Sequence, residues 1–131
     1  MDEKLREEIK RLQQLRSADA ASWLIETYPQ NGVDCGEAIK LMEHVSWKRP
    51  DQIRLAEHYL VSIPFASGKT YEVFASFMSV KNLIRAIGFH LPKEESDISL
   101  LRYYLEPVLM KSAKSQKELE VVKLFLSELN Q

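Results

Sequence analysis

Hydrophobic side chains recur at intervals of three and four residues along almost the whole chain, and no long alternating stretch argues for a β-strand. Such intervals place side chains on one face of an α-helix. The four glycines and five prolines fall mostly between the periodic stretches. The pattern therefore predicts about seven helices, at residues 2–15, 19–28, 35–45, 50–63, 70–89, 97–109 and 115–129.

Residue types that favour helix ends support several of these boundaries. Asp34 with Glu37, and Ser115 with Glu118, have the spacing of a capping box, in which two side chains satisfy free amides at a helix start. Pro107 lies inside a predicted helix, where a proline removes one backbone hydrogen bond. We expect a kink or a break in the helix at that point.

The segment 70–89 is predicted to be the longest helix and to lie at the centre of the fold. Its broad apolar face includes Phe74, Phe77 and Ile84. Truncation of a buried phenylalanine to alanine costs about 3–5 kcal/mol, and we expect a loss of that size for Phe77→Ala.

Short connections constrain how these helices pack. Loops of about 3–7 residues make neighbouring helices mostly antiparallel. The predicted fold is all-α, with residues 1–131 forming one domain. That domain is expected to be a helical bundle or a short stack of helical hairpins, including an open arc of the HEAT or armadillo kind.

The charges are balanced, with 18 basic and 19 acidic side chains and a net charge of −1. Such a chain has no global basic field for gripping nucleic acid. Its single cysteine, Cys35, excludes an intramolecular disulfide, and its charged first residues are not those of a signal peptide. No apolar run approaches the roughly 18 residues of a membrane span. We expect a cytoplasmic protein that does not enter a membrane.

The residue types used in metal and nucleotide sites are present without the spacing that such sites need. Glu43 and His44, like Glu57 and His58, are adjacent pairs, whose side chains point about 100° apart on a helix and do not converge. The segment 67–70, Ser-Gly-Lys-Thr, is similar to the end of a phosphate loop but lacks the first glycine of that loop. We expect no metal, no cofactor and no small-molecule substrate.

Two groups of side chains are candidates for binding another protein. Trp47, Lys48 and Arg49 combine an aromatic ring with two cations on the connection between two predicted helices. Tyr103 and Tyr104 follow each other on a later helix. Tryptophan, tyrosine and arginine are the residues most often found at binding hot spots. We therefore expect these five residues at a docking surface.

The expected function is that of a non-catalytic cytosolic protein-binding module, and specifically of a small immunity or antitoxin protein that binds and blocks a toxin domain. Glu43 and Glu57 lie in the slightly acidic N-terminal half and would add carboxylates to its binding surface. Three alternatives remain open: an adaptor or regulatory subunit of a larger complex, a weak nucleic-acid binder using Trp47, Lys48 and Arg49, and an enzyme using His58 or Cys35.

Overall fold

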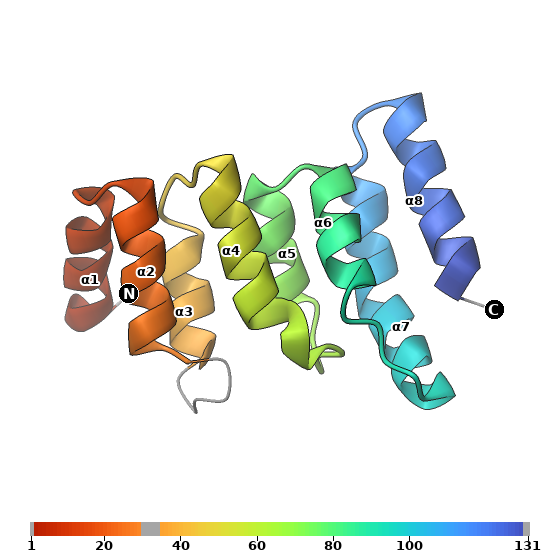
Figure 1. Ribbon diagram of the computed structural model, residues 1–131, viewed down its shortest axis with the longest axis horizontal. Coiled ribbons are helices and arrows are strands. Elements are labelled where there is room, and N and C mark those ends of the chain that lie inside the picture. The colour runs from red at the N-terminus through yellow and green to blue at the C-terminus, as the bar shows by residue number, and fades with distance from the viewer. Residues whose placement is uncertain (1, 30–34, 130–131) are drawn as a thin grey trace. The chain divides into compact units, whose positions relative to one another are not determined.

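The computed structural model describes residues 2–29 and 35–129 and shows an all-helical chain (Figure 1). These residues form eight α-helices and one short 3₁₀ helix, and they contain no strand. The prediction of an all-α fold is confirmed. The chain divides into two compact units, Met1–Tyr59 (unit 1) and Leu60–Gln131 (unit 2). The expectation of one domain over residues 1–131 stays a prediction.

Unit 1 contains four helices, and short connections reverse the chain direction from α1 to α2 and from α3 to α4 (Figure 1). These helices are α1 (Glu3–Gln13), α2 (Ser17–Thr27), α3 (Cys35–Met42) and α4 (Arg49–Tyr59). Helix α2 packs against α4, and α1 packs against α3. The predicted cap at Asp34 lies outside the described residues.

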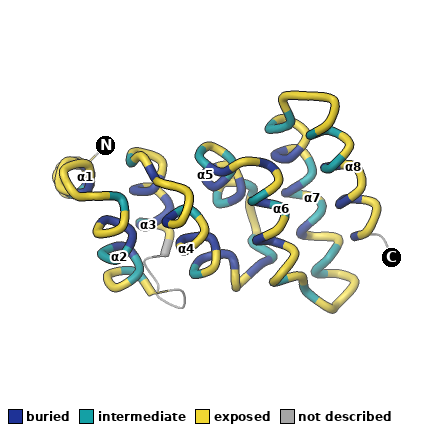
Figure 2. Tube along the Cα trace, turned by 45° about the horizontal axis from the view of Figure 1, so that its top comes forward, coloured by how far each residue is buried: buried dark blue, intermediate teal, exposed yellow. Residues whose placement is uncertain are grey.

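The core of unit 1 is made mainly of aliphatic side chains that each helix contributes from one face (Figure 2). Its largest fully buried members are Leu12, Leu24, Leu41, Met42 and Leu55. The end of α4 is also tied to α2 by polar contacts, because the Tyr59 hydroxyl lies 3.1 Å from the Leu24 carbonyl and 2.8 Å from the Tyr28 carbonyl. Apolar packing and this tyrosine together hold α2 and α4 side by side.

Unit 2 begins with the 3₁₀ helix η1 (Leu60–Ser62) and continues with four α-helices. These helices are α5 (Lys69–Phe77), α6 (Val80–Gly88), α7 (Glu95–Ser112) and α8 (Gln116–Leu129). Helix α7 packs against both α5 and α8, and α6 packs against α5 and α8. The predicted cap of α8 is present, because the Glu118 amide donates to Ser115 Oγ at 3.1 Å and the Glu118 carboxylate accepts from the Lys114 amide at 2.7 Å.

The prediction of one long helix over residues 70–89 is wrong, because the chain turns between α5 and α6. Met78 adopts an extended backbone conformation, with φ −101° and ψ 148°. Ser79 then caps α6 by accepting the Asn82 amide at 3.1 Å. Serine is a preferred N-cap residue, whereas the apolar spacing runs through this point without interruption. The capping signal therefore outweighed the periodicity.

Of the kink or break expected at Pro107, the break is absent, since α7 runs unbroken from Glu95 to Ser112, and the kink stays a prediction. The proline ring lies on the exposed side of the helix. The preceding and following turns are anchored by Leu101, Leu105, Val108 and Leu109, which are all buried. Burial on both sides of the proline maintains the helix although one backbone hydrogen bond is missing.

Phe74, rather than Phe77, is the central phenylalanine of unit 2. The Phe74 side chain is fully buried, whereas Phe77, the last residue of α5, is only partly buried. The two rings contact each other with their centroids 5.4 Å apart. The large loss of stability expected for Phe77→Ala therefore belongs to Phe74→Ala.

Candidate protein-binding surfaces

Trp47, one of the predicted contact residues, lies in the core of unit 1 and not on its surface. Only 7% of the residue is exposed. Its indole Nε1 donates to the Met42 carbonyl at 3.0 Å, across the connection between α3 and α4. The ring thereby covers the end of α3 and fixes where the connection leaves that helix.

Asp51 is the buried charged residue of the described chain, with 6% of its surface exposed. Its carboxylate accepts a hydrogen bond from the Ser17 hydroxyl at 2.6 Å and contacts the Arg54 guanidinium at 3.4 Å. Arg54 also donates to Ser22 Oγ at 2.9 Å. A buried carboxylate is costly unless it is paired and hydrogen-bonded, and these donors meet that requirement. They join the start of α4 to the start of α2.

The backbone between α3 and α4 is fastened to this network and to its neighbours. The Lys48 amide donates to Ser17 Oγ at 2.9 Å, so the serine hydroxyl links the connection to Asp51. The Trp47 carbonyl accepts from Gln52 Nε2 at 2.9 Å. The His44 carbonyl accepts from Gln13 Nε2 of α1 at 2.8 Å. Side chains from α1, α2 and α4 thus hold this connection in one position.

Residues 43–49, from the end of α3 to the first residue of α4, form what we call the basic connection, and Lys48 and Arg49 are its exposed cations. Neither charged head forms an ion pair or a hydrogen bond with the described residues. Glu43 is exposed at the end of α3, with its Oε1 3.9 Å from the ring nitrogen Nε2 of His44. Glu57 is exposed on α4. Of the five predicted contact residues in unit 1, four are exposed and Trp47 is buried.

Asp51 was not among the predicted site residues, although its neighbour Arg54 is a signal for it. Aspartate in the first turn of a helix after a proline is common and ordinarily faces solvent. Ser17 lies 34 positions away in the sequence, so the hydrogen bond that buries Asp51 depends on the packing of α2 against α4. Arg54, three residues after Asp51, was the local hint of a paired carboxylate.

In unit 2, the adjacent residues Tyr103 and Tyr104 differ in how far they are exposed to solvent. Tyr103 is 72% exposed, whereas Tyr104 is partly buried. Their rings meet edge to face, with centroids 4.9 Å apart. Adjacent positions on a helix cannot share a face, so only Tyr103 presents its full ring to solvent.

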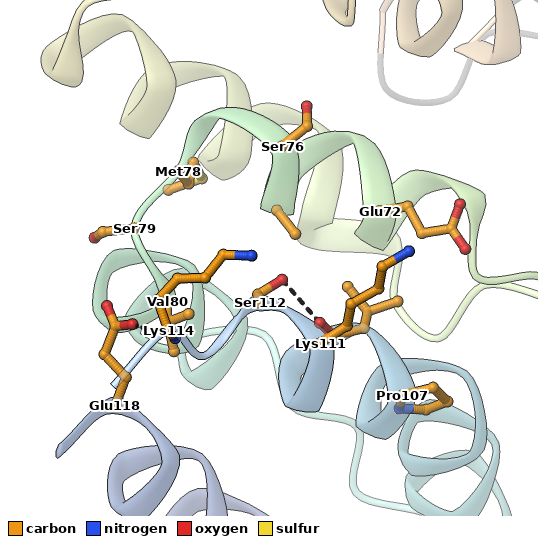
Figure 3. A pocket seen from close by; sticks show the side chains of 12 residues that line it. Glu72, Ser76, Met78, Ser79, Val80, Pro107, Lys111, Ser112, Lys114 and Glu118 are labelled. Carbon is orange, nitrogen blue, oxygen red and sulfur yellow. Dashed lines mark hydrogen bonds between the residues drawn. The ribbon is translucent and has the colours of Figure 1, made fainter. Parts of the chain in front are cut away.

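A cavity of unit 2 lies beside the end of α7 and has a volume of about 610 Å³ (Figure 3). Its lining combines apolar side chains with two lysines and two glutamates: Lys111, Lys114, Glu72 and Glu118. Ser112 also lines it, with its hydroxyl already bound to the Val108 carbonyl at 2.8 Å. The opposite charges balance, and the lining brings together no set of groups that defines one ligand.

Of the two residues considered for catalysis, the structure describes the side chain of His58. His58 is partly buried, and its Nε2 atom is enclosed without a hydrogen-bond partner among the described residues. Its ring packs edge to face on Tyr59, with centroids 4.5 Å apart. The Cys35 side chain lies outside the described part of the structure. Within that part, no three His, Cys, Asp or Glu side chains gather as metal ligands would.

Tyr71 is the titratable group that its surroundings alter most clearly. Its side chain is fully buried, and its hydroxyl accepts the Phe65 amide at 3.1 Å. Burial raises the pKa of the Tyr71 hydroxyl above its ordinary value, and the Phe65 hydrogen bond opposes part of that rise. The amide contact shows that this tyrosine fastens the segment before α5 to the core.

Comparison of the chain with family models, with curated proteins and with solved structures gave no match. In the residues that the structure describes, no helix has the length and apolar character needed to cross a bilayer.

Proposed function

We propose that the chain is a non-catalytic protein-binding module whose partner docks on the basic connection of unit 1. The observation that supports this proposal is the hydrogen bond from the Lys48 amide to Ser17, which in turn binds the buried Asp51. An exposed connection held in this way is already ordered before a partner arrives.

Pre-organisation matters because binding costs free energy for each segment that it immobilises. The backbone of the basic connection is fixed by three side chains, from Gln13, Ser17 and Gln52. Only the Lys48 and Arg49 side chains remain to be ordered. Arginine is enriched at binding hot spots, and an unpaired guanidinium is available to a partner's carboxylate.

The specific form of the proposal is a cytosolic immunity or antitoxin protein that blocks a toxin domain. Glu43 and Glu57 would pair with cations of that partner, while Lys48 and Arg49 would pair with its carboxylates. An adaptor or regulatory subunit would use the same surface. The identity of the partner separates the two, since a toxin partner would lose activity on binding and a housekeeping partner would form a lasting complex.

Nucleic-acid binding is the second candidate, and the burial of Trp47 weighs against it. Single-stranded nucleic acids are bound by aromatic rings on which bases stack. The Trp47 ring is packed in the core, so Lys48 and Arg49 would have to act by charge alone. Affinity that falls steeply with added salt would be the sign of such binding.

The test is affinity capture of the tagged chain in its own cells, followed by binding measurements with the purified partner. We expect Lys48→Ala/Arg49→Ala to weaken the complex at least about tenfold, because hot-spot losses commonly reach that size. The matched control is Arg6→Ala/Lys10→Ala, which removes two exposed cations from α1. Equal affinity of the two double variants would reject the basic connection as the docking surface.

A further inference from the structure

One face of α7 carries exposed apolar side chains at helical spacing. Leu100, Tyr103, Pro107 and Met110 are all exposed, and we call them the α7 stripe. At about 100° per residue, these four positions fall within roughly 80° of the helix surface. They therefore form one continuous strip and not four scattered side chains.

The stripe is separate from the faces of α7 that build the core of unit 2. Those faces pack against α5 and α8 through Leu101, Leu105, Val108 and Leu109. Tyr103, with 72% of its surface exposed, lies near the middle of the stripe. Single exposed hydrophobic residues are ordinary, but a run of four on one helix face is typical of a docking surface.

We propose that a second copy of this chain covers the α7 stripe, in a two-fold dimer whose α7 helices run antiparallel and cross near residue 105. A two-fold interface requires a patch that is complementary to itself. In this register, Leu100 of each copy faces Met110 of the other. Tyr103 faces Pro107, so that an aromatic ring covers a proline ring on both sides of the axis.

The charges at the two ends of α7 favour this occupant and this direction. Glu95 and Asp97 lie in the first turn of the helix, and Lys111 lies in its last turn. In the antiparallel register, Lys111 of one copy lies opposite residue 99 of the other, within one turn of Asp97. A parallel pair would instead bring like charges together, which is unfavourable. Two copies of the α7 stripe in antiparallel orientation are therefore complementary in both apolar side chains and charge.

The size of the α7 stripe indicates how tightly two copies of the chain should bind each other. A single pair of helices belongs to the small class of interfaces, below about 1,200 Å² in total, which are weak and transient. The inference is independent of the proposed function, because it uses another unit and another set of side chains.

The first test is sedimentation equilibrium of the full chain from about 1 µM to 1 mM, which spans weak association constants. We expect the average mass to rise from monomer toward dimer over this range. Tyr103→Glu should weaken association more than about tenfold, since it replaces a central aromatic contact with a charge. Leu100→Glu should also weaken it. Its control is Ile53→Glu on α4, because Ile53 and Leu100 are both 37% exposed.

The second test is a charge swap that only contact between two copies can rescue. Asp97 and Lys111 of one chain are separated by 14 residues, or about 21 Å along the helix axis, so they cannot pair with each other. Asp97→Lys and Lys111→Asp should each weaken the dimer about threefold or more, as each change acts at two symmetric sites. The double variant should restore wild-type association.

A wild-type chain that stays monomeric throughout this range would overturn the inference. So would a dimer that Tyr103→Glu leaves unchanged, or a charge-swapped double variant no stronger than the single variants. Circular dichroism of each variant checks that the helices are retained, so that loss of the dimer is not confused with loss of the fold.

Discussion

The basic connection of unit 1 and the α7 stripe of unit 2 are exposed surfaces that are held in place by different means. The connection lies between helices, so it has no regular backbone ladder, and side chains from three helices bind its amide and carbonyl groups. The stripe lies on an 18-residue helix whose own backbone bonds fix it. A connection therefore needs hydrogen bonds from specific side chains to hold its backbone. In a helix, the backbone hydrogen bonds already fix the direction of each side chain.

This difference predicts different sensitivities to substitution. Removing one polar partner should disturb the connection even where the packing of the core is untouched. Removing a stripe side chain should leave the fold intact and alter only what touches it. Substitutions in the core, in the polar contacts of the connection and on the exposed surfaces test this contrast.

The largest expected loss is in the core of unit 2. Phe74→Ala should lower the free energy of unfolding by about 3–5 kcal/mol, because it removes a fully buried ring. Phe77→Ala should cost clearly less, because that ring is only partly buried. Urea denaturation of the two variants measures both values. Equal losses would mean that the two rings contribute alike to the core.

In unit 1, Asp51→Ala should cost about 2–3 kcal/mol, since hydrogen bonds to a charged group are worth about 1.5–3 kcal/mol. Ser17→Ala should cost about 1 kcal/mol and also release the Lys48 amide, whose exchange with deuterium should become faster. Glu57→Ala, which removes an exposed carboxylate from the same helix as Asp51, is the control. A loss no greater for Asp51→Ala than for Glu57→Ala would mean that the network does not stabilise the connection.

The raised pKa of Tyr71 predicts that this residue makes the free energy of unfolding depend on pH in alkaline solution only. Its pKa is raised by burial, so the unfolded chain loses the hydroxyl proton first as the pH rises. The free energy of unfolding should therefore fall above about pH 10 and level off only when the folded hydroxyl ionises. Tyr71→Phe should lack this component and should cost about 1 kcal/mol at neutral pH through the lost Phe65 contact. An identical alkaline profile in the variant would assign the effect to other groups.

The smallest effects on stability should come from the surfaces themselves. Lys48→Ala, Arg49→Ala and Tyr103→Ala should each change the free energy of unfolding by no more than about 0.5 kcal/mol. Thermal denaturation is sufficient to check this. A larger loss at Lys48 or Arg49 would indicate a structural role for their side chains, and the case for a docking surface there would weaken.

The helical fold could be predicted from the sequence because apolar spacing is repeated in every element. The helix boundaries that were predicted wrongly depend on features other than the apolar spacing. The turn between α5 and α6 rests on one serine, Ser79, and the continuity of α7 through Pro107 rests on burial in the turns around it. The spacing of the apolar residues predicts neither the turn between α5 and α6 nor the continuity of α7.

For the candidate surfaces, residue type alone was a weaker guide. Lys48, Arg49 and Tyr103 are exposed as expected, while Trp47 is buried. A tryptophan serves a core as readily as a binding surface, and only the packing around Met42 decides between the two. Arg54 is a local hint that Asp51 is paired, but the burial of Asp51 depends on Ser17, which is 34 positions away in the sequence.

The position of Trp47 has a practical consequence for following how this chain unfolds. Trp23 and Trp47 are its two tryptophans, and both belong to unit 1. Indole fluorescence therefore reports the melting of that half alone, whereas the far-ultraviolet dichroism of the helices reports both halves. Coincident transitions would show that the halves melt as one cooperative block, and separated transitions would show two.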